Sequence, residues 1–179
     1  MKITNTEIDG LVVIEPNVYK DERGYFFEFY HALRYELPYA GQFVQDNEAK
    51  SNKGVLRGVH FQTGINAQGK LVRVVIGSVF DVAVDLRKDS ETFGRWYGIH
   101  LSGENKKQLW IPRGFAHGYL VLEDETIFSY KCDNYYHKLA EQGIRYDDPT
   151  LKINWPDVGG PYIVSEKDLA LGTITDLTL

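Results

Sequence analysis

Apolar and polar residues alternate over short stretches along most of the chain, and few stretches have the spacing of an amphipathic helix. Alternation with a period of two is typical of a β-strand with one buried face. The stretches that we predict to be strands are 10–15, 25–30, 54–62, 70–76, 79–87, 96–101, 108–111, 117–122 and 126–132. Turn residues separate them. We therefore predict an all-β sandwich, jelly roll or barrel in a single domain over residues 1–179.

Turn residues between the strands predict which strands are neighbours. Gly77-Ser78 separates two β-branched runs within 70–87, and this pattern predicts a β-hairpin with a two-residue turn. Residues 21–24 have the composition of a turn between the first two strands. On this basis, 10–15 and 25–30 are expected to lie on either side of that turn.

Two short helices are predicted in the otherwise β-rich pattern. The first lies near 31–37 and is ended by Pro38, because the residue before a proline avoids helical backbone angles. The second begins after Ser165. Ser165 with Asp168 three residues later resembles a helix capping box, with aspartate in the place that glutamate or glutamine usually holds.

The strand at 54–62 carries polar side chains where packing residues are expected. Strict alternation places His60 beside Gly58 on one face and Arg57 on the opposite face. A glycine next to an imidazole leaves space that suits a ligand, whereas the alternative is a histidine satisfied by hydrogen bonds in the core. A bulge at Gly58 would bring Arg57 and His60 to one ligand.

Charge and composition exclude several classes of protein. The net charge is −5 with acids and bases mixed, which argues against a general binder of nucleic acid or anionic membranes and leaves room for a local anion site. No apolar run approaches the roughly 20 residues of a membrane span, and the first residues lack a signal core, so we predict a cytoplasmic protein. The single cysteine, Cys132, has no partner for an internal disulfide.

A pair of histidines fits part of a known metal-binding pattern. Residues 112–117 match P-x-G-x-x-H, the second signature of the cupin jelly rolls, and Gly54 with His60 resembles the start of the first. Metal-binding cupins continue with a second histidine, where this chain has Gln62, and an amide is a poor ligand for zinc or iron. We therefore predict a site without metal. An incomplete metal site formed by His60 and His117 is the alternative.

Several segments taken together are more specific than any single motif. They are Gly54-Val-Leu-Arg-Gly-Val-His-Phe-Gln62, Gln68-Gly-Lys-Leu-Val-Arg-Val74, Asp81-Val-Ala-Val-Asp-Leu-Arg87, Ile111-Pro-Arg-Gly-Phe-Ala-His-Gly118, and Tyr130-Lys-Cys with Tyr135-Tyr136. With these segments the chain closely resembles the dTDP-4-dehydrorhamnose 3,5-epimerases. The resemblance implies a cupin jelly roll, a homodimer, no cofactor, and the substrate dTDP-4-dehydro-6-deoxy-glucose on the route to dTDP-L-rhamnose.

The resemblance also implies catalytic roles. Inversion of a carbon next to a ketone requires a base on one face, an acid on the other, and a donor that holds the enolate charge. The family pattern makes His60 the base, Asp168 its acidic partner and Tyr130 the proton donor, and a histidine is suited to take a proton near neutral pH. Lys70, at the start of a strand, is the candidate to stabilise the enolate oxygen. For Asp168 this role competes with helix capping.

Substrate-binding residues follow from the same resemblance. Arg23 and Arg57 match the family's phosphate-binding arginines, whose forked guanidinium suits phosphate oxygens. Tyr136 matches the ring that stacks on thymine. The remaining implied contacts to the nucleotide or the sugar are Glu28, Gln45, Asn47, Lys70, His117, Glu141 and Lys167.

Other functions stay open at this point. Small departures from the family pattern are Val59 where leucine is commoner, the loop residues 63–66, and His137-Lys138 after the tyrosine pair. They leave open whether both C3 and C5 or only one carbon is inverted. A sugar-binding jelly roll without catalysis and a metal-dependent cupin enzyme are the further alternatives. Solvent exchange at the carbons next to the ketone separates catalysis from binding.

Overall fold

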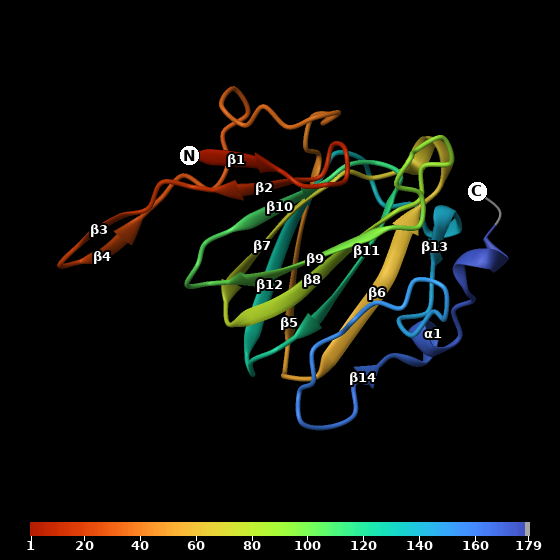
Figure 1. The fold of residues 1–179 in the computed structure, drawn as a ribbon. Helices are drawn as coiled ribbons and strands as arrows, with labels where there is room; N and C mark the ends of the chain where they lie inside the picture. The colour runs from red at the N-terminus through yellow and green to blue at the C-terminus, as the bar shows by residue number, and fades with distance from the viewer. Residues whose placement is uncertain (178–179) are drawn as a thin grey trace.

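Two mainly antiparallel sheets face each other in the computed structural model, which describes residues 1–177 (Figure 1). The first sheet has the order β1 (Lys2–Asn5), β2 (Val12–Glu15), β10 (Gln108–Ile111), β7 (Lys70–Ile76), β12 (Thr126–Cys132) and β5 (Gln45–Ser51). The second has the order β13 (Glu141–Gly143), β6 (Val55–Gln62), β11 (Phe115–Val121), β8 (Ser78–Asp85) and β9 (Trp96–Ser102), with β14 (Ile163–Val164) paired in parallel to β6. The predicted all-β jelly roll is confirmed.

Helices are short and peripheral. They comprise α1 (Glu166–Leu169) and the 3₁₀ turns η1 (Gly64–Asn66), η2 (Lys138–Ala140) and η3 (Ile174–Asp176). None of the helices within residues 1–177 has the length and the apolar character needed to cross a membrane. The helix that begins after Ser165 is present as predicted, and Ser165 caps it by accepting a hydrogen bond from the Asp168 N–H at 3.1 Å.

Three apolar clusters hold the sheets in place. The largest fills the space between the two sheets and includes Val72, Leu109, Val121 and Phe128. A second covers the outer face of the second sheet with the C-terminal segment, and a third packs the N-terminal loop against Trp110. Full burial of an aliphatic or aromatic side chain of this size contributes about 1.5–3 kcal/mol. The sheets therefore form a rigid frame for whatever side chains point between them.

The segment around Gly77-Ser78 is not a hairpin, which corrects the prediction. Strand β7 pairs with β10 and β12 in the first sheet, whereas β8 pairs with β11 and β9 in the second. The chain crosses from one sheet to the other at this glycine, whose φ is +77°. Two β-branched runs around a turn look the same in sequence whether they pair with each other or with strands far along the chain.

The N-terminal region also differs from the prediction. Strand β2 pairs with β1 and β10, and the hairpin is formed instead by β3 (Tyr19–Asp21) and β4 (Gly24–Phe26), which projects away from the two sheets in Figure 1. Residues 27–30 are not a strand. The predicted helix at 31–37 is only a turn, because a seven-residue segment is too short to stabilise a helix by itself, and Tyr35 packs into the third cluster instead.

Strict alternation along β6 is wrong at one point. The register between β6 and β11 changes from His60 opposite His117 to Arg57 opposite Tyr119, so β6 contains one extra residue there. Gly58 lies within this bulge with φ +107°, and a Cβ on it would come within 2.6 Å of the His117 carbonyl oxygen. The bulge turns the side chains of Arg57 and His60 toward the same cavity.

Candidate active site

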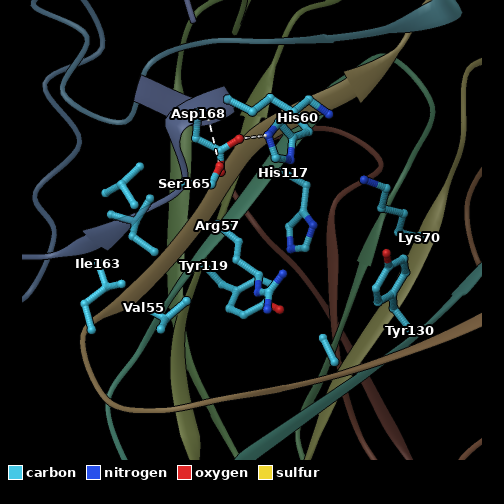
Figure 2. Close-up of a pocket in the computed structure, with 14 residues that line it drawn as sticks. Val55, Arg57, His60, Lys70, His117, Tyr119, Tyr130, Ile163, Ser165 and Asp168 are labelled. Atoms are coloured by element: carbon cyan, nitrogen blue, oxygen red, sulfur yellow. Dashed lines mark hydrogen bonds and ion pairs between the residues drawn. The ribbon is translucent and has the colours of Figure 1, made fainter. Parts of the chain in front are cut away.

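A cavity of about 500 Å³ opens between the two sheets (Figure 2). Both sheets, together with the segment from β14 to α1, contribute to its wall. The residues that line it are Ala49, Val55, Leu56, Arg57, His60, Lys70, His117, Tyr119, Tyr130, Ile163, Val164, Ser165, Lys167 and Asp168. Seven of the residues singled out in the sequence therefore share one cavity.

His60 and Asp168 form a close pair at one side of the cavity. Nε2 of His60 lies 2.6 Å from Oδ1 of Asp168, and the other carboxylate oxygen accepts the backbone N–H of Gly58 at 3.3 Å. Because the aspartate side chain points to His60, the predicted capping box forms only on the Ser165 side. Burial lowers the pKa of His60, although the Asp168 carboxylate opposes this shift. A carboxylate only accepts hydrogen bonds, so Nε2 carries the proton and Nδ1 keeps the lone pair of a base.

Tyr130 and Lys70 lie on the other sheet. They belong to the adjacent strands β12 and β7, where Cys132 is opposite Lys70, and Figure 2 shows them across the cavity from His60 and Asp168. Desolvation lowers the pKa of the Lys70 ammonium, and the charges of Cys132, Asp81 and Glu141 only partly offset it. Desolvation also raises the pKa of the Tyr130 phenol. The tyrosine is therefore a protonated donor over the whole neutral range.

Arg57 and His117 line the cavity next to His60 and lie below it in the view of Figure 2. Nε and Nη2 of Arg57 donate to the Ser51 hydroxyl at 3.3 and 3.1 Å, which leaves further guanidinium donors for a ligand. His117 is opposite His60 on the neighbouring strand, and its Nε2 lies 2.9 Å from Oδ2 of Asp81. A guanidinium and a buried imidazole thus line the same wall as the His60–Asp168 pair.

A chain of polar contacts reaches from the cavity to β5. Lys167, which lines the cavity, forms an ion pair with Glu141 at 2.7 Å, and the Tyr136 hydroxyl donates to the same carboxylate at 2.8 Å. The Tyr136 N–H donates to Gln45, and the amide of Gln45 donates to Asn47. Burial alone would raise the pKa of Glu141, but Lys167 and Tyr136 together hold it below its usual range.

Six implied substrate contacts do not line this cavity. Gln45, Asn47, Tyr136 and Glu141 are linked to it through Lys167 by the contacts above, whereas Arg23 and Glu28 lie apart from it. Arg23 lies in the β3–β4 hairpin region and pairs with Asp21, while Glu28 pairs with Arg34 at 3.2 Å. Both side chains are exposed, and neither borders the cavity.

Sequence reasoning missed several residues in and behind the cavity wall. Tyr119 lines the cavity but received no role. Asp81, which belongs to a matching segment, and Ser51 also received none, although they contact His117 and Arg57. Asp81 interrupts an apolar strand as His60 does, so the same signal was available for it. Ile163 and the other apolar residues of the wall gave no signal, because their type is ordinary for a strand.

The sequence left open whether the two cavity histidines, His60 and His117, are ligands of an incomplete metal site. Within residues 1–177, no group of three or more His, Cys, Asp or Glu side chains is gathered closely enough to hold a metal ion. His60 and His117 each direct Nε2 to a carboxylate of its own. The absence of metal from the reaction stays a prediction.

Comparison with known proteins gives one consistent result. The sequence model of the dTDP-4-dehydrorhamnose 3,5-epimerase family matches residues 5–176. The dTDP-4-dehydrorhamnose 3,5-epimerase of Shigella flexneri is 53% identical over 171 residues, which are 94% of this chain and 93% of that protein.

Solved structures agree with this match. A dTDP-6-deoxy-D-glucose-3,5-epimerase from Legionella pneumophila Philadelphia 1, in complex with dTDP-4-keto-L-rhamnose, is 52% identical with a TM-score of 0.95, covering 99% of this chain and 94% of that one. A 3'-monoepimerase from Streptomyces bikiniensis, in complex with dTDP-quinovose, is 30% identical with a TM-score of 0.88, covering 95% and 86%. The chain belongs to the dTDP-4-dehydrorhamnose 3,5-epimerase family.

Proposed function

We propose that this protein is a dTDP-4-dehydrorhamnose 3,5-epimerase that converts dTDP-4-dehydro-6-deoxy-D-glucose to dTDP-4-dehydro-L-rhamnose. One observation carries the proposal beyond the family assignment. A histidine backed by a carboxylate and a protonated tyrosine lie on opposite sheets across one cavity. A sugar ring between them would have a base on one face and an acid on the other, which is what inversion requires.

Each step of the inversion is assigned to one residue. Nδ1 of His60 removes the proton from the carbon next to the ketone, and Asp168 stabilises the imidazolium that forms. The electron pair moves onto the ketone oxygen, where the Lys70 ammonium stabilises the enolate. Tyr130 then donates its phenolic proton to the opposite face of the same carbon. Exchange with solvent returns both groups to their starting protonation states before the second carbon reacts.

Substrate binding is assigned to the surrounding cations and amides. Arg57 binds the diphosphate, His117 contacts the sugar, and Tyr136 stacks on the thymine ring. Gln45, Asn47, Glu141 and Lys167 complete the contacts to the nucleotide and the sugar. The hydrogen bonds that already join these side chains support this assignment, since they hold the group together before a ligand arrives.

We also propose a homodimer in which the projecting hairpin brings Arg23 and Glu28 to the cavity of the partner. The exposed side chains of Tyr19, Tyr25 and Phe26 on this hairpin support a contact with a second chain. Sedimentation at micromolar concentration is expected to give a dimer. A fully active monomer would contradict both the dimer and the shared site.

Proton NMR in deuterated water tests the reaction. With dTDP-4-dehydro-6-deoxy-glucose, deuterium is expected at both C3 and C5, together with the L-rhamno configuration. Exchange and inversion at one carbon only would instead support a single-carbon epimerase, as in the Streptomyces bikiniensis relative. Binding without any exchange would mean a non-catalytic sugar-binding protein.

Chelation tests the expected independence from metal. Extensive treatment with a chelator should leave the rate unchanged, because His60 and Tyr130 supply the base and the acid. If activity is lost and one divalent ion restores it, a metal-dependent cupin mechanism replaces the one proposed.

A further inference from the structure

A buried carboxylate oxygen behind the wall of the cavity lacks any hydrogen-bond partner within residues 1–177. The side chain of Asp81 is 0% exposed, its Oδ2 lies 2.9 Å from Nε2 of His117, and its Oδ1 has no partner within residues 1–177. On β8, the neighbours of Asp81 on the same face are Val79 and Ala83, which are apolar and fully buried. His117 is therefore the one hydrogen-bond partner of this carboxylate in the described part of the chain.

Such an arrangement contributes little to the stability of the fold. A buried ionised group is costly unless its oxygens are satisfied, and one hydrogen bond leaves half of the carboxylate unpaired. By contrast, Asp85 lies four residues further along β8 and accepts hydrogen bonds from Arg87, Ser90 and Thr92. Asp85 has the partners expected of a structural carboxylate, whereas Asp81 does not.

The geometry of the strands explains how Asp81 reaches His117. On β11, His117 is opposite Ala83 and Tyr119 is opposite Asp81, so Asp81 and His117 are diagonal neighbours on one face. The small side chain of Ala83 leaves room between them. The Phe128 ring also stacks on the His117 imidazole, with 6.0 Å between the ring centroids and an interplanar angle of 23°.

The carboxylate determines which nitrogen of His117 carries the proton. Since a carboxylate only accepts, Nε2 of the neutral imidazole must be the protonated nitrogen. Nδ1 then keeps a lone pair and has no hydrogen-bond partner among the residues that the structure describes. His117 lines the cavity, so Nδ1 is the polar atom that remains for a ligand.

We propose that Asp81 is a positioning residue for substrate binding, which holds His117 in the Nε2–H tautomer so that Nδ1 accepts a hydrogen bond from a sugar hydroxyl. The proposal rests on the proposed function in taking a nucleotide sugar as the ligand. Under this proposal, each of the two cavity histidines has its tautomer fixed by a hydrogen bond from Nε2 to a carboxylate. Asp168 holds the base His60, and Asp81 holds the binding residue His117.

The test compares Asp81→Asn with the wild type by nitrogen NMR of histidine-labelled, ligand-free protein at mildly alkaline pH. Signals of His117 are identified by their loss in His117→Gln. The wild type is expected to show the Nε2–H tautomer. In Asp81→Asn the amide can donate to Nε2 as well as accept from it, so a mixture or the Nδ1–H tautomer is expected.

Kinetics supply the second measurement. Asp81→Asn should raise KM by about tenfold and change kcat by less than about threefold, because the lost contact is made in binding. Asp85→Asn is the matched control on the same strand. It should lower the melting temperature and leave both the His117 tautomer and KM unchanged.

Two results would overturn the proposal. One is a wild-type His117 in the Nδ1–H tautomer, which is decisive even if the variant fails to fold. The other is an Asp81→Asn protein that keeps the Nε2–H tautomer and the wild-type KM. Since the tautomer measurement needs no substrate, it decides the role of Asp81 even where the wild type fails to epimerise.

Discussion

The two walls of the cavity differ in whether their reactive side chains are hydrogen-bonded to other residues of the protein. On the second sheet, His60 and His117 are each fixed by a hydrogen bond to a buried carboxylate. On the first sheet, Tyr130 and Lys70 have pKa values shifted mainly by desolvation, with no hydrogen bond from the described residues among the causes. One wall is organised by internal hydrogen bonds before substrate arrives, and the other has donors that are left for a ligand.

This difference matches the demands of the two kinds of proton transfer. A base must have its lone pair directed at the carbon, and a carboxylate behind the imidazole fixes both the tautomer and the ring orientation. An acid and an oxyanion donor need only be protonated and unpaired, and burial keeps a phenol protonated. The following predictions test this contrast, from the largest expected effect to the smallest.

The base is expected to be indispensable. His60→Ala should lower turnover by about 10⁴-fold and also abolish solvent exchange at C3 and C5, because no enolate forms without a base. Proton NMR in deuterated water measures both quantities. Exchange at the wild-type rate in this variant would assign the base to another residue, with His117 as the next candidate.

The second-largest loss of turnover is expected from changing Asp168, the carboxylate that binds the base His60. Asp168→Asn preserves the shape of the side chain but lets its amide donate to Nε2, so turnover is expected to fall by about 10³-fold. The control is Asp85→Asn, which changes a buried carboxylate on β8 outside the cavity and should leave turnover unchanged. An Asp168→Asn enzyme of nearly wild-type rate would reduce Asp168 to a structural residue of α1.

Loss of the acid should separate exchange from inversion. Tyr130→Phe is expected to slow inversion by about 10²-fold, while His60 still removes a proton and returns solvent deuterium to the same face. The signature is therefore deuterium in substrate of unchanged configuration. If the variant inverts at nearly the wild-type rate, Tyr130 is a packing residue and the acid is a water molecule or another side chain.

The smallest expected effect is the dependence of kcat/KM on pH. Because burial lowers the pKa of His60, kcat/KM should rise with pH through a value below about 6.5, the usual pKa of a histidine. On the alkaline side, kcat/KM should fall as Lys70 loses its proton, at a pH below about 10.4, since its pKa is also lowered. A pH profile of kcat/KM measures both limbs. An acid limb above the usual histidine pKa would mean that Asp168 outweighs burial.

Local pattern was sufficient to determine the fold class and most strands. The period-two alternation predicted β12 at the residues where it lies, and 70–76, 96–101 and 108–111 correspond closely to β7, β9 and β10. These predictions succeed because the pleat of a strand places successive side chains on opposite faces wherever the strand lies. The five segments compared above, taken together, likewise identified the family.

Pairing between distant segments was decided only by the tertiary structure. The sequence around Gly77-Ser78 does not say that its two strands enter different sheets, and strict alternation separates Arg57 from His60 until the bulge at Gly58 brings them together. His60 and Asp168 are 108 positions apart, yet their atoms lie 2.6 Å from each other. Alternation and turns are encoded by neighbouring residues, whereas the site depends on which strands the folded sheets place side by side.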